Sequence, residues 1–223
     1  MNHPGSRVRL VLASNNEKKL LELRALLAPS GVELVSQRSL GIGEADEPHH
    51  TFVENALAKA RHAAHRSGGP AMADDSGLCV DALGGAPGVA SAHFALLGEE
   101  AAVGPPGPAE RERFRSRQDR ANNALLLERL LGQADRRARF VGTLVAVRSA
   151  DDPEPLVAVG RWFGQIAEAP RGEAGFGYDA LMFIPPLGCS VAELPSDVKN
   201  RHSHRALAAA QMLALMRESW GLG

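Results

Sequence analysis

Residues 7–36, RVRLVLASNNEKKLLELRALLAPSGVELVS, contain the pattern that sets the fold class of this chain. Arg7 to Ala13 is a short apolar run typical of a buried strand, and Ser14 to Asn16 is a polar turn. Glu17 to Ala28 carries leucines at helical spacing, and Val32 to Ser36 predicts a second strand. A strand, a helix and a strand in succession indicate an α/β protein.

The rest of the chain continues this alternation and then changes to a hairpin pattern. Thr51 and Glu54 have capping-box spacing at the start of a helix that we expect to end near Gly68. Further strands are predicted at 71–75, 137–149, 156–166 and 180–184, and helices at 119–131 and from Ser203 onward. We therefore predict a long mixed β-sheet flanked by helices, in a single domain over residues 1–223, with a loop or disordered insertion at about 103–117.

Composition excludes several classes of protein before any motif is considered. The 223 residues include 25 basic and 26 acidic side chains, so the net charge of −1 provides no general field for binding nucleic acid. No apolar run approaches the ~20 residues of a membrane span. Cys79 and Cys189 have no metal or disulfide-framework spacing, and we interpret them as free thiols in a reducing cytoplasm.

Two polar segments in the first third of the chain can hold a metal–phosphate group. The turn Ser14–Asn16 opens a helix that carries Lys18 and Lys19, and a helix N-terminus favours anions; helix capping is the alternative. Asp74 and Asp75 end a predicted strand, and the pair Asp46/Glu47 precedes the second helix. Mg²⁺ needs one or two such carboxylates, although adjacent aspartates also occur as turn devices.

Two later segments have the chemistry of a nucleotide pocket. Residues 171–179, RGEAGFGYD, place glycines beside Phe176 and Tyr178, which is typical of a loop that approaches a flat ligand; a tight bend with core aromatics is the alternative. Residues 199–205, KNRHSHR, concentrate cations just before the last helix. Arg205 can grip phosphate or a base edge, whereas a solvated surface run is the alternative.

The order of these motifs is more specific than any one of them, and together they closely resemble the inosine triphosphate pyrophosphatase family. The resemblance runs from about residue 8 to the last helix, with an unusually long segment at about 103–117. It implies an elongated α/β fold related to that of the Maf proteins, two lobes around a central cleft, and a homodimer. The motifs that carry it are Ser14–Lys19, Thr51–Ala60, Ala73–Leu78, Gly84–Val89, Gly175–Asp179, Ala192–Leu194, Lys199 and Ser203–Arg205.

The resemblance also implies a reaction and its residues. Enzymes of this family hydrolyse dITP, ITP and XTP with Mg²⁺ to the monophosphate and pyrophosphate, and a cytoplasmic enzyme is expected. Asp75 would be the catalytic carboxylate and a metal ligand, and either Asp46 or Glu47 would supply another ligand. The substrate would be bound by Ser14, Asn15, Asn16, Glu17, Lys18, Lys19, Ser76, Phe176, Gly177, Tyr178, Asp179, Lys199, His204 and Arg205.

Selectivity for deaminated purines turns on the 6-oxo group. A donor such as His204, Arg205 or a backbone amide would bond to that oxygen and be left unpaired by adenine. Two alternative functions remain at this stage: a Maf-like pyrophosphatase acting on pyrimidine or modified nucleotides, and a nucleotide-binding sensor without turnover. The expected partners are the nucleoside triphosphate and a second copy of the chain, and neither nucleic acid nor a membrane is expected.

Overall fold

The structure is a computed structural model that describes residues 8–96 and 107–222. The chain forms two compact units. Unit 1 comprises the described residues up to Ser76, Val141–Arg161, and the described residues from Asn200 on; unit 2 comprises the described residues of Gly77–Phe140, with Trp162–Lys199. The prediction of one domain over residues 1–223 stays a prediction, since residues 1–7, 97–106 and 223 lie outside the described part.

The sheet has seven strands and is mixed, as the sequence predicts. Strand β1 pairs in parallel with β2 and β3, whereas β6 pairs antiparallel with β5 and β7. The strand order is β2 (Val32–Ser36), β1 (Val8–Leu12), β3 (Ala71–Val80), β4 (Arg137–Val147), β5 (Leu156–Ile166), β6 (Met182–Ile184) and β7 (Cys189–Ser190). The helices are α1 (Glu17–Leu27), α2 (Phe52–Ser67), α3 (Pro108–Arg129), α4 (Ser196–His202) and α5 (His204–Trp220).

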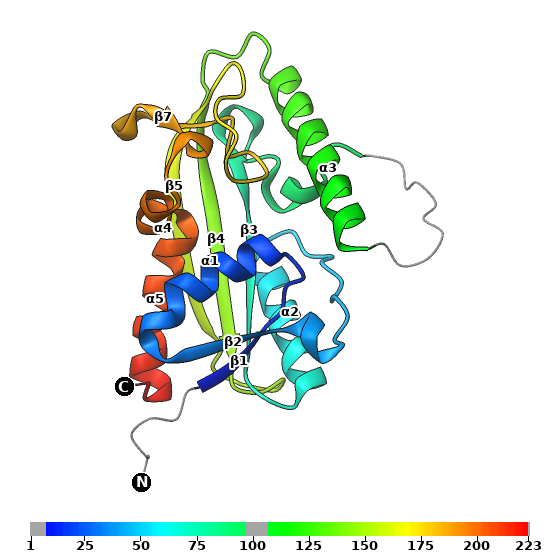
Figure 1. The fold of residues 1–223 in the computed structure, drawn as a ribbon, viewed down its shortest axis with the longest axis vertical. Helices are drawn as coiled ribbons and strands as arrows, with labels where there is room; N and C mark the ends of the chain where they lie inside the picture. The colour runs from blue at the N-terminus through cyan, green and yellow to red at the C-terminus, as the bar shows by residue number, and fades with distance from the viewer. Residues whose placement is uncertain (1–7, 97–106, 223) are drawn as a thin grey trace. The chain divides into compact units, whose positions relative to one another are not determined.

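Unit 1 has helices on both faces of its strands, because apolar residues alternate along β1. Leu10 and Leu12 are buried with the leucines of α1 and the apolar stripe of α5. Val11 and Ala13 point the other way and are buried with the alanines of α2. Figure 1 shows α1 and α5 side by side, and the two helices are in contact. The period of two in a strand therefore assigns one helix layer to each face.

Unit 2 has a core of its own. Leu126 of α3 and Leu130, the residue that caps its C-terminal end, are buried together with Leu78 and Val80 of β3. Trp162 of β5 belongs to the same cluster, as do the aliphatic residues of β6. Among the described residues, no helix of either unit combines the length and apolarity that a bilayer crossing needs.

Two boundaries differ from the sequence prediction. Strand β3 continues through Ser76 and Gly77, past the predicted end at residue 75, because Leu78 and Val80 beyond them enter the core of unit 2. Helix α3 begins at Pro108, so the expected loop is wrong for 108–117; residues 103–106 lie outside the described part. The Glu/Arg-rich stretch there favours a helix, and Pro is well suited to a first turn.

Candidate active site

Asp74 and Asp75 lie within β3 rather than at its end, and they point to opposite faces of the strand. Met72, two residues before Asp74, packs with the α1–α5 layer, and Ala73, two before Asp75, packs with the α2 layer. The last pair between β1 and β3 is Leu12 with Met72. The two carboxylates therefore follow the point where β1 ends and its turn into α1 begins.

Asp74 is fully buried, and each of its carboxylate oxygens accepts from at least one donor. Its Oδ1 accepts from Lys19 Nζ at 2.7 Å and from Ser76 Oγ at 2.7 Å, and its Oδ2 accepts from Arg205 Nε at 2.8 Å. Burial by itself would raise the pKa of Asp74, but the charges of Arg205 and Lys19 outweigh it and hold the pKa well below its usual range. Asp74 is therefore a permanent anion at the centre of a cluster.

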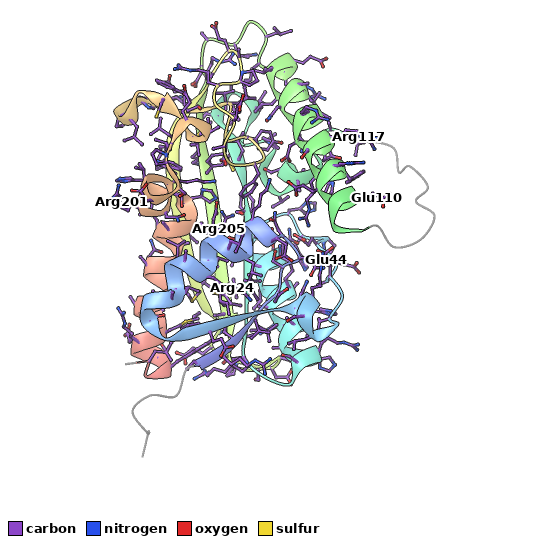
Figure 2. The ribbon with its side chains drawn as sticks, viewed as in Figure 1. Arg24, Glu44, Glu110, Arg117, Arg201 and Arg205 are labelled. Atoms are coloured by element: carbon purple, nitrogen blue, oxygen red, sulfur yellow. The ribbon has the colours of Figure 1, made fainter. Side chains whose placement is uncertain are left out.

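Arg205 closes this cluster from α5. Its side chain is 2% exposed; Nη1 bonds to Glu22 of α1, and Nη2 donates to Ser76 Oγ at 3.0 Å. Figure 2 labels Arg205 where α5 starts, next to α1. The sequence predicted a nucleotide-binding Arg205, and that stays a prediction. The structure adds a second task, since this guanidinium joins α5, α1 and β3.

Asp75 is buried but only half satisfied. Its Oδ1 accepts from Lys59 Nζ at 2.8 Å, and the same ammonium donates to Glu47 at 2.8 Å. Among the described residues, Asp75 Oδ2 is buried and has no hydrogen-bond partner. Burial raises the pKa of Asp75 despite the opposing charge of Lys59. A carboxylate oxygen in this state is available to a ligand.

Lys59 of α2 is a residue of this site that the sequence motifs did not single out. Its side chain is only 11% exposed and bridges two carboxylates. Burial lowers the pKa of Lys59, but the charges of Asp75 and Glu47 more than compensate and raise it. Lys59 lies in the Thr51–Ala60 motif. The signal for its role is the buried Asp75, which lies on the face of β3 toward α2.

The two members of the acidic pair before α2 differ in their contacts. Glu47 meets Lys59, whereas no contact ties the exposed Asp46 to this group. Across the described residues no group of three or more His, Cys, Asp or Glu side chains is arranged as a metal cage. Mg²⁺ often takes only one or two protein carboxylates beside water and phosphate oxygens, so the unpartnered Asp75 oxygen with Glu47 nearby fits it.

The turn into α1 is capped, as the alternative interpretation expected. Asn16 Oδ1 accepts from the backbone amides of Lys18 at 3.0 Å and Lys19 at 3.2 Å, and Ser14 Oγ accepts from the Asn16 amide. Asn15 Oδ1 accepts from Gln37. Glu17 and Lys18 are exposed, whereas Lys19 points to Asp74. This turn therefore caps α1 and also leads into Lys19, whose ammonium group pairs with Asp74.

Two glycines determine where α5 starts. Ser203 caps the helix by accepting from the Ala206 amide, and the ring of His204, the next residue, is buried. A Cβ on Gly160 of β5 would lie 1.9 Å from the His204 carbonyl oxygen, and one on Gly142 of β4 would lie 2.9 Å from the His204 ring. Glycine inside a strand is the sequence signal of such a close approach.

The remaining predicted residues form a second group, within unit 2. Lys199 Nζ bonds to Asp179 at 2.8 Å and lies 4.8 Å from the centre of the Phe176 ring. Tyr178 is buried, and its hydroxyl donates to the Ser91 carbonyl. Burial raises the pKa of Tyr178 far above its ordinary value, and the charge of Asp119 adds to this. The segment 176–179 is therefore a fixed loop with a partly exposed aromatic ring.

The chain was compared with known proteins. A model of the Ham1 family matches residues 10–215. The chain is 68% identical over 213 residues to a dITP/XTP pyrophosphatase of Methylibium petroleiphilum (96% of this chain, 99% of the relative). It is 67% identical over 215 residues to that of Leptothrix cholodnii (96% and 100%). A solved HAM1 protein from Coxiella burnetii superposes with a TM-score of 0.81 at 37% identity (95% and 100%).

Proposed function

The chain belongs to the Ham1 family, and from this premise we propose that it is a nucleoside-triphosphate pyrophosphatase that removes dITP, XTP and ITP from the nucleotide pool. The products are the nucleoside monophosphate and pyrophosphate. The names of the relatives, at up to 68% identity over nearly the whole chain, support the substrate class. The resemblance noted in the sequence is thereby confirmed at the level of the family.

The observation that carries the site assignment is the half-satisfied Asp75. We assign it the role of general base, in which Oδ2 accepts a proton from the attacking water. Among the described residues Oδ2 is buried and has no hydrogen-bond partner, so the acceptor that a base needs is open. Lys59 donates to the other oxygen, Oδ1, and thereby fixes the orientation of the carboxylate.

Mg²⁺ is the proposed cofactor, and Asp75 and Glu47 are the residues that would hold it. When bound, it would neutralise charge on the phosphate oxygens at the scissile bond. Lys59 holds the carboxylates of Asp75 and Glu47 near each other, because its ammonium group donates to both. Asp46 is the less suitable member of the acidic pair, because it is exposed and has no contact with this group.

The other predicted residues divide by chemistry. We assign Ser14–Lys19 to the triphosphate, with Ser76 and Arg205 beside it through the Asp74 cluster. Phe176–Asp179, Lys199 and His204 are assigned to the nucleoside. A homodimer and a cytoplasmic location complete the proposal; they rest on the family resemblance and on where nucleotide pools are found.

The decisive experiment measures pyrophosphate and phosphate released from dITP, XTP, ITP, ATP, GTP and dUTP, with Mg²⁺ and with EDTA. We expect pyrophosphate from dITP, XTP and ITP, Mg²⁺ dependence, and much slower turnover of ATP and GTP. Comparable turnover of dITP and dUTP would instead support a Maf-like enzyme. Tight binding of dITP without any product would support a sensor.

A further inference from the structure

Both backbone polar groups of Gly177, the amide and the carbonyl, bond to side chains of one helix, α3. Its φ of +61° lies in the left-handed region, which favours glycine. Its amide donates to Asp119 Oδ2 at 2.8 Å, and its carbonyl accepts from Asn123 Nδ2 at 3.0 Å. Asp119 and Asn123 are four residues apart on α3, so they share one face of the helix.

The residue after Gly177 is tied to the same helix by a second route. Tyr178 donates its hydroxyl to the Ser91 carbonyl at 2.9 Å. Asn122 of α3 donates to that same carbonyl at 3.2 Å and also to the carbonyl of Ala92. Two consecutive loop residues are therefore fixed to α3, one directly and one through Ser91.

The internal shape of the loop has a different origin. Asp179 accepts from the Phe176 amide at 3.0 Å and from Lys199, and a Cβ on Gly175 would lie 2.2 Å from its carboxylate. The bond from Lys199 also ties Asp179 to α4, and the Asp179 carbonyl accepts from the Ala192 amide at 3.1 Å. The bonds to Gly177 and Tyr178 are the ones that tie the loop to α3, directly and through Ser91.

We propose that Asp119 and Asn123 are positioning residues of the nucleotide site, which hold the Gly177 peptide so that the Phe176 ring and Asp179 meet the nucleoside. The proposal rests on the assignment of residues 176–179 to the nucleoside in the proposed function. Loss of the Asp119 carboxylate leaves a loop amide without its acceptor, and the loop can then leave its binding geometry. Because the loop binds a part of the substrate that does not react, binding weakens more than chemistry.

The test measures KM and kcat for dITP in Asp119→Leu, Asp119→Asn and Asn123→Leu. Asp119→Leu removes the acceptor and is expected to raise KM about tenfold with kcat within about twofold of the wild type. Asp119→Asn keeps an acceptor oxygen and should restore most of the loss. Arg120→Ala, an exposed change at the next position of α3, is the matched control and should leave both parameters unchanged.

A double-mutant cycle with Phe176→Ala separates this inference from the proposed function. If the helix acts through the loop, Asp119→Leu adds little to the KM of Phe176→Ala. A Phe176→Ala variant with wild-type KM would remove the loop from the nucleoside site and overturn the proposed assignment. A raised KM in Phe176→Ala beside an unchanged KM in both Asp119→Leu and Asn123→Leu would overturn only the positioning role. If Asp119→Leu fails to fold, the KM values of Asn123→Leu and Asp119→Asn decide.

Discussion

The two faces of β3 in unit 1 use neighbouring aspartates in opposite ways. On the face toward α1 and α5, Asp74 is bonded at both oxygens by Lys19, Ser76 and Arg205. On the face toward α2, Asp75 is bonded at one oxygen by Lys59, and its other oxygen has no partner among the described residues. The pKa of the first is held low and the pKa of the second is raised.

This difference separates a structural carboxylate from a reactive one. A buried charge with all its bonds made joins the elements that supply the donors, here α1, α5 and β3. A buried charge with an open oxygen costs stability and is retained where a ligand completes it. The comparison predicts that stability and activity respond to opposite members of the pair.

The largest expected effect is on turnover in Asp75→Asn. The amide cannot accept the proton of the attacking water, so kcat for dITP should fall by about 100- to 10 000-fold. The free energy of unfolding should change by no more than about 1 kcal/mol, since the raised pKa shows that the buried charge is unfavourable and Lys59 keeps Glu47. Steady-state kinetics and urea denaturation measure the two effects. Full activity in this variant would refute the assigned base.

The next effect is on stability in Asp74→Ala. It leaves the guanidinium of Arg205 and the ammonium of Lys19 without their buried partner, and should cost about 3–5 kcal/mol of unfolding free energy. The double variant Asp74→Ala/Lys19→Met removes one of the two orphaned cations as well and should recover part of that loss. Urea denaturation of the single and double variants checks both. A loss below about 1 kcal/mol would show that the cluster is not structural.

The smallest effect concerns Asp152, a satisfied carboxylate outside the candidate site. Its Oδ2 accepts from the Arg148 amide at 2.8 Å and from Arg148 Nε, and its Oδ1 accepts from Arg148 Nη2 and the Glu154 amide. The hydrogen bonds of the Arg148 side chain outweigh burial and lower the pKa of Asp152. Asp152→Asn should therefore cost about 1.5–3 kcal/mol at pH 7 without changing KM or kcat.

The pH dependence of that loss follows from the lowered pKa. A carboxylate with a depressed folded-state pKa stabilises the protein above its unfolded value of about 3.9, and this contribution is lost as pH falls toward the folded value. The difference in unfolding free energy between wild type and Asp152→Asn should thus shrink between about pH 4 and pH 2. A difference that grows in acid would contradict the assignment.

Much of the fold could be predicted from local pattern. The strand–helix–strand start and the parallel β1–β2 pair follow from residues 7–36. The caps at Thr51 and Ser203 were likewise readable. The far half of β3 was missed because Ser76-Gly77 favours a turn until the core beyond it is known. The first turns of α3 were missed because the prolines before the charged run at 108–117 indicate a loop more strongly than its Glu/Arg content indicates a helix.

The sequence by itself determined the order of the motifs, and with it the family, since that order is a property of the chain. It also placed Asp74 and Asp75 next to each other at a predicted strand. Only the tertiary structure decided which of the two is satisfied, because Lys19, Arg205 and Lys59 come from three helices whose packing brings their charges to one strand or the other. Long-range burial and charge, which no local pattern records, separate the structural aspartate from the reactive one.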